Sequence, residues 1–176
     1  MAAYLLILVA VFSRVVPHPW MNFTAVGAGL LYFGARRPLR ESALPVLALM
    51  ATDYYLTVFA YHYPFHTSAY LITWAWYAAA IVLGRIMLHR QITVTRLVAA
   101  PVLASTSFFV VSNYAVWAGS AMYPHSLAGL GICYAAGLPF YANDVLSTTL
   151  IAGIAFGLPI AARKLAEHRA HGRLAA

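Results

Sequence analysis

The chain has 176 residues, of which 63% are hydrophobic and 9% are charged, and its formal net charge at pH 7 is +7. These values exclude an ordinary soluble domain and predict a protein embedded in the lipid bilayer. The positive charge does not indicate nucleic-acid binding, because the basic residues stand at the ends of apolar stretches. Cys133 is the only cysteine, which excludes an internal disulfide and a cysteine-based metal cage.

Apolar stretches predict an all-α membrane protein with six transmembrane helices. A span needs about 20 residues, with about 17 as the lower limit. The segment SLAGLGICYAAGLPF, residues 126–140, is too short and glycine-rich to cross alone, so it predicts a short extra half-helix, re-entrant or interfacial, between the last two spans. We expect one transmembrane domain over 1–162 and a basic tail over 163–176. The six helices are expected at about 2–16, 22–35, 42–60, 67–84, 96–119 and 140–162.

Basic residues follow every second apolar stretch, and this alternation predicts the topology. Since cytoplasmic loops of membrane proteins are enriched in Lys and Arg, both termini are expected in the cytoplasm of a bacterium, with the chain crossing its inner membrane several times. The N-terminal apolar run has no basic residue before it, so we interpret it as a retained helix and not as a cleaved signal peptide. The three clusters are Arg36, Arg37 and Arg40; Arg85, Arg90 and Arg96; and Arg163, Lys164, Arg169 and Arg173.

Small residues at four-residue spacing predict where helices approach closely. Such spacing lets helix backbones pack by van der Waals contact in lipid. We expect packing within the chain rather than dimerisation to use them. The pairs are Ala25 and Gly29, Ala80 and Gly84, and Gly153 and Gly157.

Three ionisable residues fall in predicted spans away from the basic clusters. Arg14 and Asp53 lie toward the outer ends of helices 1 and 3, where an ion pair between them would reduce the cost of burying each charge. That pair would either hold the helices together or serve a ligand in an outward-open cavity. Asp144 stands at the expected start of helix 6, where it would cap the helix N-terminus.

Polar and aromatic residues gather on the same outer side. Convergent polar groups in an aromatic-lined cavity are typical of small-molecule sites, although single interfacial Trp and Tyr residues commonly act as membrane anchors. The candidate binding residues are Arg14, His18, Trp20, Asn22, Asp53, Tyr54, His66, Asn113, Trp117, Tyr123 and Asn143.

Signatures of catalysis are absent from the sequence. It contains no GxSxG elbow, no HExxH pair and no phosphate-binding loop of the GxxxxGK[ST] type. We therefore expect neither an enzyme nor a bound cofactor. His62 and His66 have the i, i+4 spacing of metal ligands, but Pro64 between them argues against a continuous helix, so they are weak candidates for a metal site.

Two segments and the helix that carries Asp53 resemble a family of small bacterial membrane proteins. The segments are RVVPHPWMNFTAVGAGLLYFGA (14–35) and SNYAVWAGSAMYPHSLAGLGICYAAGLPFYAN (112–143). That family is described as similar to the substrate-binding S components of energy-coupling-factor (ECF) vitamin transporters. The resemblance implies a six-helix bundle with an outward pocket, which delivers a vitamin-like solute to a scaffold subunit and an ATPase module. The Ala-x-x-x-Ala pair that S components commonly use for docking is absent from helix 1.

The function expected from the sequence is binding and uptake of a small solute by a protein in the bilayer. Under this hypothesis Arg14, Asp53, Asn113 and Asn143 hold polar groups of the solute, while aromatic residues close over its apolar faces. The first alternative is a structural or accessory membrane subunit without its own ligand. The second is uptake of a transition metal through the outer histidines.

Overall fold

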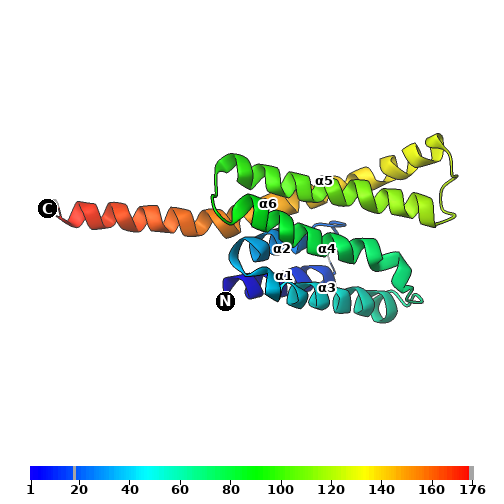
Figure 1. Ribbon diagram of the computed structural model, residues 1–176, viewed down its shortest axis with the longest axis horizontal. Helices are drawn as coiled ribbons and strands as arrows, with labels where there is room; N and C mark the ends of the chain where they lie inside the picture. The colour runs from blue at the N-terminus through cyan, green and yellow to red at the C-terminus, as the bar shows by residue number, and fades with distance from the viewer. Residues whose placement is uncertain (18, 175–176) are drawn as a thin grey trace.

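The computed structural model describes the backbone of residues 1–17 and 19–174 and, near the C-terminus, the side chains of residues up to 163 and of residues 166 and 167. This part of the chain is all-helical, as predicted, and contains no strand (Figure 1). Six α-helices follow one another along it: α1 (Ala2–Val15), α2 (Val26–Arg36), α3 (Ala43–Tyr55), α4 (Thr67–Leu88), α5 (Val94–Gly119) and α6 (Leu127–Leu174). A 3-10 turn, η1 (Leu39–Glu41), precedes α3, and a π-helical turn, η2 (Leu56–Ala60), extends it.

Four helical segments of the described chain are long and apolar enough to cross a membrane, which indicates a membrane protein. They are Leu39–Ala60, Thr67–Leu88, Val94–Gly119 and Leu127–Arg163. The helix count of six agrees with the sequence, but α1 and α2 have only 14 and 11 residues. At 1.5 Å per residue they are about 21 and about 16 Å long, which is short of a hydrocarbon core of about 30 Å.

The last helix corrects the prediction of a separate half-helix. α6 begins at Leu127 and runs without a break through residues 126–140 and 140–162 to Leu174. Pro139 lies inside α6 and, without a backbone N–H, cannot donate a hydrogen bond to the carbonyl of Ala135. Apolar surroundings disfavour unpaired backbone groups, so the chain loses less by continuing the helix through one proline than by ending it. Residues 163–174, predicted as a tail, are helical as well.

The short helix α2 forms the centre of the bundle, and every residue from Val26 to Ala35 is buried. It crosses α4 at two glycines. A Cβ atom on Gly34 would overlap the carbonyl of Ile81, and one on Gly84 would overlap the carbonyl of Leu31. The absence of side chains therefore brings the two backbones into contact, as small residues do in lipid.

Of the predicted small-residue pairs, two pack within the chain. Gly29 lies against Ala10 and Ile7 of α1, and Gly84 lies against α2. Gly153 and Gly157 of α6 differ, because no described atom comes within 4 Å of the position of a Cβ on either.

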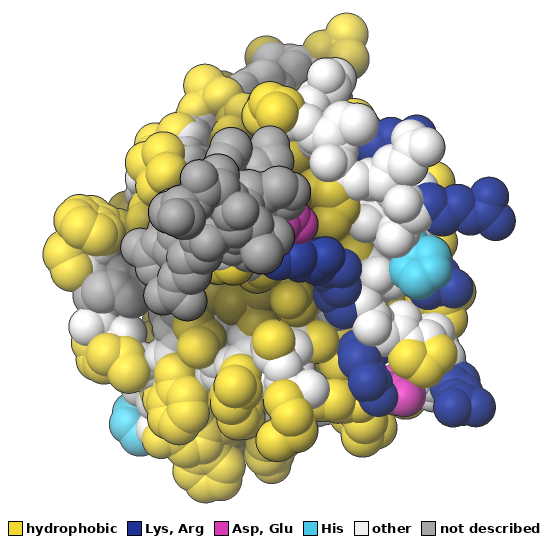
Figure 2. Space-filling view, turned by 90° about the vertical axis from the view of Figure 1, so that its left-hand side faces the viewer, with side chains coloured by type: hydrophobic (Ala, Val, Ile, Leu, Met, Phe, Trp, Pro, Cys, Tyr) yellow, Lys and Arg dark blue, Asp and Glu magenta, His cyan; other side chains and the backbone are white. Residues whose placement is uncertain are grey.

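The two ends of the bundle differ in chemistry. Arginines gather at the end that carries both chain termini, which we call the basic end (Figures 1 and 2). There the start of α1, the end of α2 and a later turn of α6 bring Met1, Arg36, Arg37 and Arg163 around one hollow. At the opposite end the α3–α4 and α5–α6 connections extend well beyond the connection between α1 and α2, as Figure 1 shows. The short α1–α2 hairpin thus leaves the bundle hollow on the side away from the basic end.

Candidate functional site

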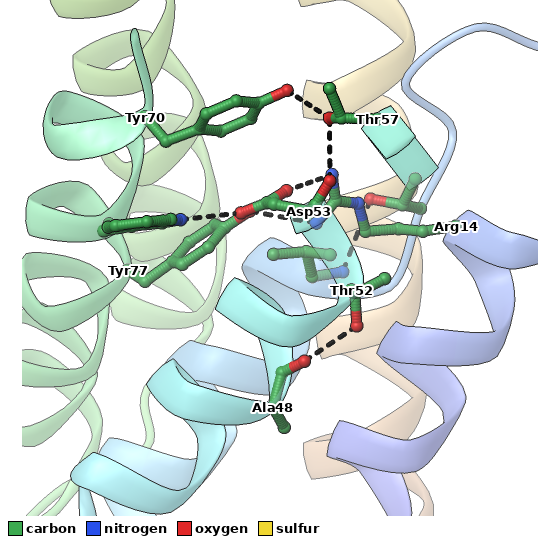
Figure 3. Close-up of polar contacts among 10 residues, drawn as sticks. Arg14, Ala48, Thr52, Asp53, Thr57, Tyr70 and Tyr77 are labelled. Atoms are coloured by element: carbon green, nitrogen blue, oxygen red, sulfur yellow. Dashed lines mark hydrogen bonds and ion pairs between the residues drawn. The ribbon is translucent and has the colours of Figure 1, made fainter. Parts of the chain in front are cut away.

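Asp53 is the centre of a polar network among α1, α3 and α4. It is only 2% exposed, and its carboxylate forms an ion pair with Arg14, in which Nη2 of Arg14 lies 2.6 Å from Oδ1 of Asp53. The indole N–H of Trp74 donates to the same carboxylate at 2.9 Å, and the Tyr77 hydroxyl lies 3.2 Å and 3.3 Å from its two oxygens. The predicted Arg14–Asp53 ion pair is therefore present, and two further donors complete it (Figure 3).

Tyr77 also connects the two charges of this pair. Its hydroxyl oxygen accepts a hydrogen bond from Nη1 of Arg14 at 3.0 Å, while its proton points to Asp53. Nη1 and Nη2 of Arg14 thus both have partners inside the protein, although 21% of the side chain remains exposed. Both charges are satisfied before any ligand arrives.

A π-helical turn shapes the chain directly after Asp53. The backbone N–H of Tyr61 donates to the carbonyl of Leu56 at 2.8 Å, which is the i to i−5 pattern of a π-helix. Thr57 donates to the carbonyl of Asp53 at 2.7 Å, and its hydroxyl makes a short contact with Tyr70 of α4. Such turns are rare and often occur at functional sites, because the extra residue reorients the side chains that follow.

Three adjoining cavities occupy the hollow half of the bundle. The first, of about 380 Å³, lies beside Arg14 and Asp53 under the α1–α2 connection. The second, of about 250 Å³, lies between α5 and α6 and is lined by Asn113 and Asp144. The third, of about 210 Å³, lies between these two and is lined by Arg14, Asp53 and Asp144. Asn22 lines all three, so they converge on the α1–α2 connection.

Asn22 adopts a backbone conformation that few residues tolerate. Its φ is +58°, in the left-handed region where Asn is one of the favoured non-glycine residues. The connection is fixed from α6, since the Asn143 amide donates to the carbonyl of Met21 at 2.9 Å. This places the Asn22 side chain at the junction of the cavities.

Asp144 is the second acid of the site and is partly buried, and its position corrects a prediction. Because α6 begins at Leu127, Asp144 lies well inside the helix and does not cap its first turn. It lines two of the cavities, Thr148 donates a long hydrogen bond of 3.5 Å to its carboxylate, and the Ser105 hydroxyl lies beside that carboxylate as well. It makes no ion pair with any residue that the structure describes.

Six of the predicted binding residues line these cavities. They come from α1, the α1–α2 connection, α3, α5 and the α5–α6 connection. They are Arg14, Trp20, Asn22, Asp53, Asn113 and Tyr123. The structure therefore brings residues from opposite parts of the sequence to one hollow.

The other predicted residues lie elsewhere. Tyr54 is 48% exposed and packs on Phe65, away from the cavities, because it follows Asp53 directly and so points to a different side of α3. His66 is exposed before the first turn of α4. Trp117 donates to the carbonyl of Pro124 and so fixes the α5–α6 connection. Asn143 acts on the α1–α2 connection, as described above. His18 lies outside the described residues.

A metal centre finds no support in the described part of the chain. No group of three or more His, Cys, Asp or Glu side chains comes together there. Both His62 and His66, the weak candidates, are exposed in the α3–α4 connection.

Sequence reasoning did not select several residues that line the site. Tyr70 and Tyr77 of α4 hold the Asp53 network, and Phe108 and Phe140 form apolar walls. Aromatic residues occur throughout an apolar chain, so no local signal distinguishes these four. Asp144 carried a signal, as an acid within an apolar segment, but the misplaced helix start led to its interpretation as a cap.

Comparison with other proteins identifies a family without a described activity. Neither the curated proteins nor the solved structures that were searched gave a match. A model for a family of unknown function, DUF6580, matches residues 1–170. The chain therefore belongs to the DUF6580 family.

Proposed function

We propose that this protein binds a small solute within the membrane, in the three adjoining cavities of its hollow half. The observation that carries this proposal is the convergence of polar side chains from five segments on one half-open hollow in an otherwise apolar bundle. Polar side chains in lipid are costly and are retained where they serve a function. Concave sites with apolar walls and few polar groups are typical of small-molecule binding.

We infer that the cavities face the outside of a bacterial inner membrane. The basic end carries the arginine clusters, and positive charge favours the cytoplasmic side, so both termini would be cytoplasmic. Binding from the outside and a hollow that stops at the buried α2 helix together favour uptake. Release inward would require a second conformation that the solute populates by binding it more tightly.

The resemblance to S components would extend this proposal to a vitamin-like micronutrient and to an ECF-type scaffold with its ATPase module. Those partners rest on the resemblance alone, and α1 lacks the Ala-x-x-x-Ala docking pair. The proposal made here concerns solute binding by this chain and does not depend on such a module.

The test is a search for a bound solute in protein purified in mild detergent. Native mass spectrometry would detect a co-purified molecule, and thermal-shift screening against vitamins, nucleobases, amino acids and amines would detect an added one. The informative variant is Asn22→Gly, because glycine accepts the positive φ while removing the side chain shared by all three cavities.

We expect a saturable shift that Asn22→Gly weakens and that Tyr54→Phe, on the exposed side of α3, leaves unchanged. An apo protein with no shift across the panel would contradict the proposal. It would favour the alternative of an accessory subunit, for which the uncovered Gly153 and Gly157 on α6 offer a surface for a partner helix.

A further inference from the structure

The two acids of the site differ in how much of their charge the protein itself compensates. Asp53 has an arginine and two further donors on its carboxylate. Asp144 has two neutral hydroxyls beside it, those of Thr148, at 3.5 Å, and of Ser105, and no cation among the described residues. An ionised carboxylate in apolar surroundings is unfavourable unless a positive group or several donors approach it. The cavity beside Asp144 provides the space for such a group.

A second polar group points to the same place. Ser105 of α5 is 1% exposed and lies beside the Asp144 carboxyl. Its hydroxyl oxygen makes no hydrogen bond of regular geometry to a described residue, and it lines the same cavity as Asp144. Beside a carboxylate, this hydroxyl can donate to Asp144 while its oxygen stays free to accept a hydrogen bond from a group in the cavity.

The charges of the cavity lining leave a deficit of positive charge. Among the described lining residues, the ionisable acids and bases are Arg14, Asp53 and Asp144. Since Arg14 is already paired with Asp53 at 2.6 Å, one carboxylate remains without a cation. A positively charged solute would supply the missing partner of Asp144, whereas an anionic solute would be repelled by the Asp144 carboxylate.

The walls around Asp144 fit an organic cation rather than a bare metal ion. Phe108 lines both cavities that Asp144 lines, and Trp76 and Tyr77 line the smaller of them. Aromatic faces attract ammonium groups, and cages of this kind recognise quaternary ammonium ligands. A metal ion would need several oxygen or nitrogen ligands, and no group of three His, Cys, Asp or Glu is present among the described residues.

We propose that the solute bound by this protein is an organic cation, a protonated amine or a quaternary ammonium compound, whose positive nitrogen pairs with Asp144 between α5 and α6. This inference rests on the proposed function, because it assigns the chemical class of the solute in the same cavities. The Ser105 hydroxyl oxygen accepts a hydrogen bond from the ammonium group when that group carries N–H donors. The Arg14–Asp53 pair forms the far wall and keeps its own charges satisfied.

The test compares molecules of similar shape that differ in charge. The probes are choline with its neutral isostere 3,3-dimethylbutan-1-ol, and benzylammonium with benzyl alcohol and benzoate, at millimolar concentration and neutral pH. Binding to the full-length protein in detergent is measured by thermal shift and by native mass spectrometry. The variants are Asp144→Asn, Ser105→Ala and, as the matched control, Glu41→Gln, which removes one negative charge near the basic end, outside the cavities.

We expect at least one cation to bind with saturation while its neutral and anionic counterparts do not. Loss of one partner of a buried charge pair should weaken that binding roughly 30-fold in Asp144→Asn. Ser105→Ala should weaken benzylammonium more than choline, because only the former has N–H donors. Glu41→Gln should leave the affinity unchanged.

Three results would overturn the inference. One is equal binding of a cation and its neutral isostere, and another is unchanged cation affinity in both Asp144→Asn and Ser105→Ala. The third is binding restricted to neutral or anionic solutes. If Asn22→Gly weakened that binding, the proposal of a small-solute site would be supported and the assignment of an organic cation would be rejected. Absence of binding by every probe and by the wider solute panel would remove both proposals together.

Discussion

Asp53 and Asp144 are two acids in the wall of one hollow, and they differ in the partners that the protein supplies to their carboxylates. The carboxylate of Asp53 has an arginine, an indole and a phenol within 3.3 Å, whereas that of Asp144 has only the neutral hydroxyls of Thr148, at 3.5 Å, and Ser105. A charge that is fully satisfied inside the fold contributes to structure, and a charge left without a partner is available to something that enters. Burial of an ionisable residue in a membrane protein therefore does not by itself indicate its role. Its role depends on whether the fold supplies enough ion-pair and hydrogen-bond partners for its charge.

The largest effect on stability is expected from breaking the satisfied pair. Asp53→Ala leaves Arg14 without its carboxylate, and removal of one partner of a buried pair should lower the free energy of unfolding by about 3 kcal/mol. Unfolding in mixed detergent micelles would measure this.

The double variant Arg14→Met/Asp53→Leu removes both charges and should recover most of the loss, since apolar residues can replace a buried pair. A double variant as unstable as Asp53→Ala would contradict the assignment of the loss to the uncompensated arginine.

A second test concerns the packing that supports Asp144. A Cβ on Gly27 would lie 2.6 Å from the Thr148 hydroxyl oxygen, and Thr148 is fully buried. Gly27→Ala should therefore push Thr148 away from Asp144 and cost about 2 kcal/mol, a typical value for overpacking. Gly153→Ala is the matched control, because no described atom lies within 4 Å and alanine favours the helix. Equal effects of the two substitutions on the unfolding free energy would contradict this account.

A smaller loss is expected from Tyr77→Phe. The substitution removes the hydroxyl that donates to Asp53 and accepts from Arg14, while the salt bridge itself remains. Hydrogen bonds to charged groups contribute about 1.5 kcal/mol at the low end, and we expect a loss of that size in the unfolding free energy. Tyr54→Phe, on the exposed side of α3, should change stability by less than about 0.5 kcal/mol.

The smallest effect on stability should come from Asp144→Asn. Its carboxylate has only hydroxyl groups beside it in the protein, and an amide oxygen can accept from them too, so replacing it with a neutral amide of similar shape should change the unfolding free energy by less than about 0.5 kcal/mol. The same substitution should weaken cation binding roughly 30-fold, so its effect on binding should be large where its effect on stability is small. A loss as large as that of Asp53→Ala would show that Asp144 has a structural partner and would remove the contrast between the two acids.

Part of the site was predictable because its signals are local. An arginine and an aspartate in apolar segments need a partner of opposite charge, and this requirement was sufficient to pair Arg14 with Asp53. Asn22, Asn113 and Tyr123 were found for a similar reason, as polar side chains at the ends of apolar segments on the same side. Tyr54 was selected with them but lies outside the three cavities, since adjacent residues of a helix point in different directions. Its selection used proximity to Asp53 in the sequence and not helical geometry.

Local patterns in the sequence were sufficient to predict an all-helical membrane protein of six helices with its basic residues on one side. Hydrophobicity and charge act locally, on each segment separately, so their pattern is sufficient for these properties. Only the tertiary structure decided that α6 continues through Pro139, that α1 and α2 are too short to fill the bundle, and that Asp144 faces the resulting cavity. These features depend on which helices pack together and how closely, and the two glycines of the α2–α4 crossing set that distance through contacts between residues far apart in the chain.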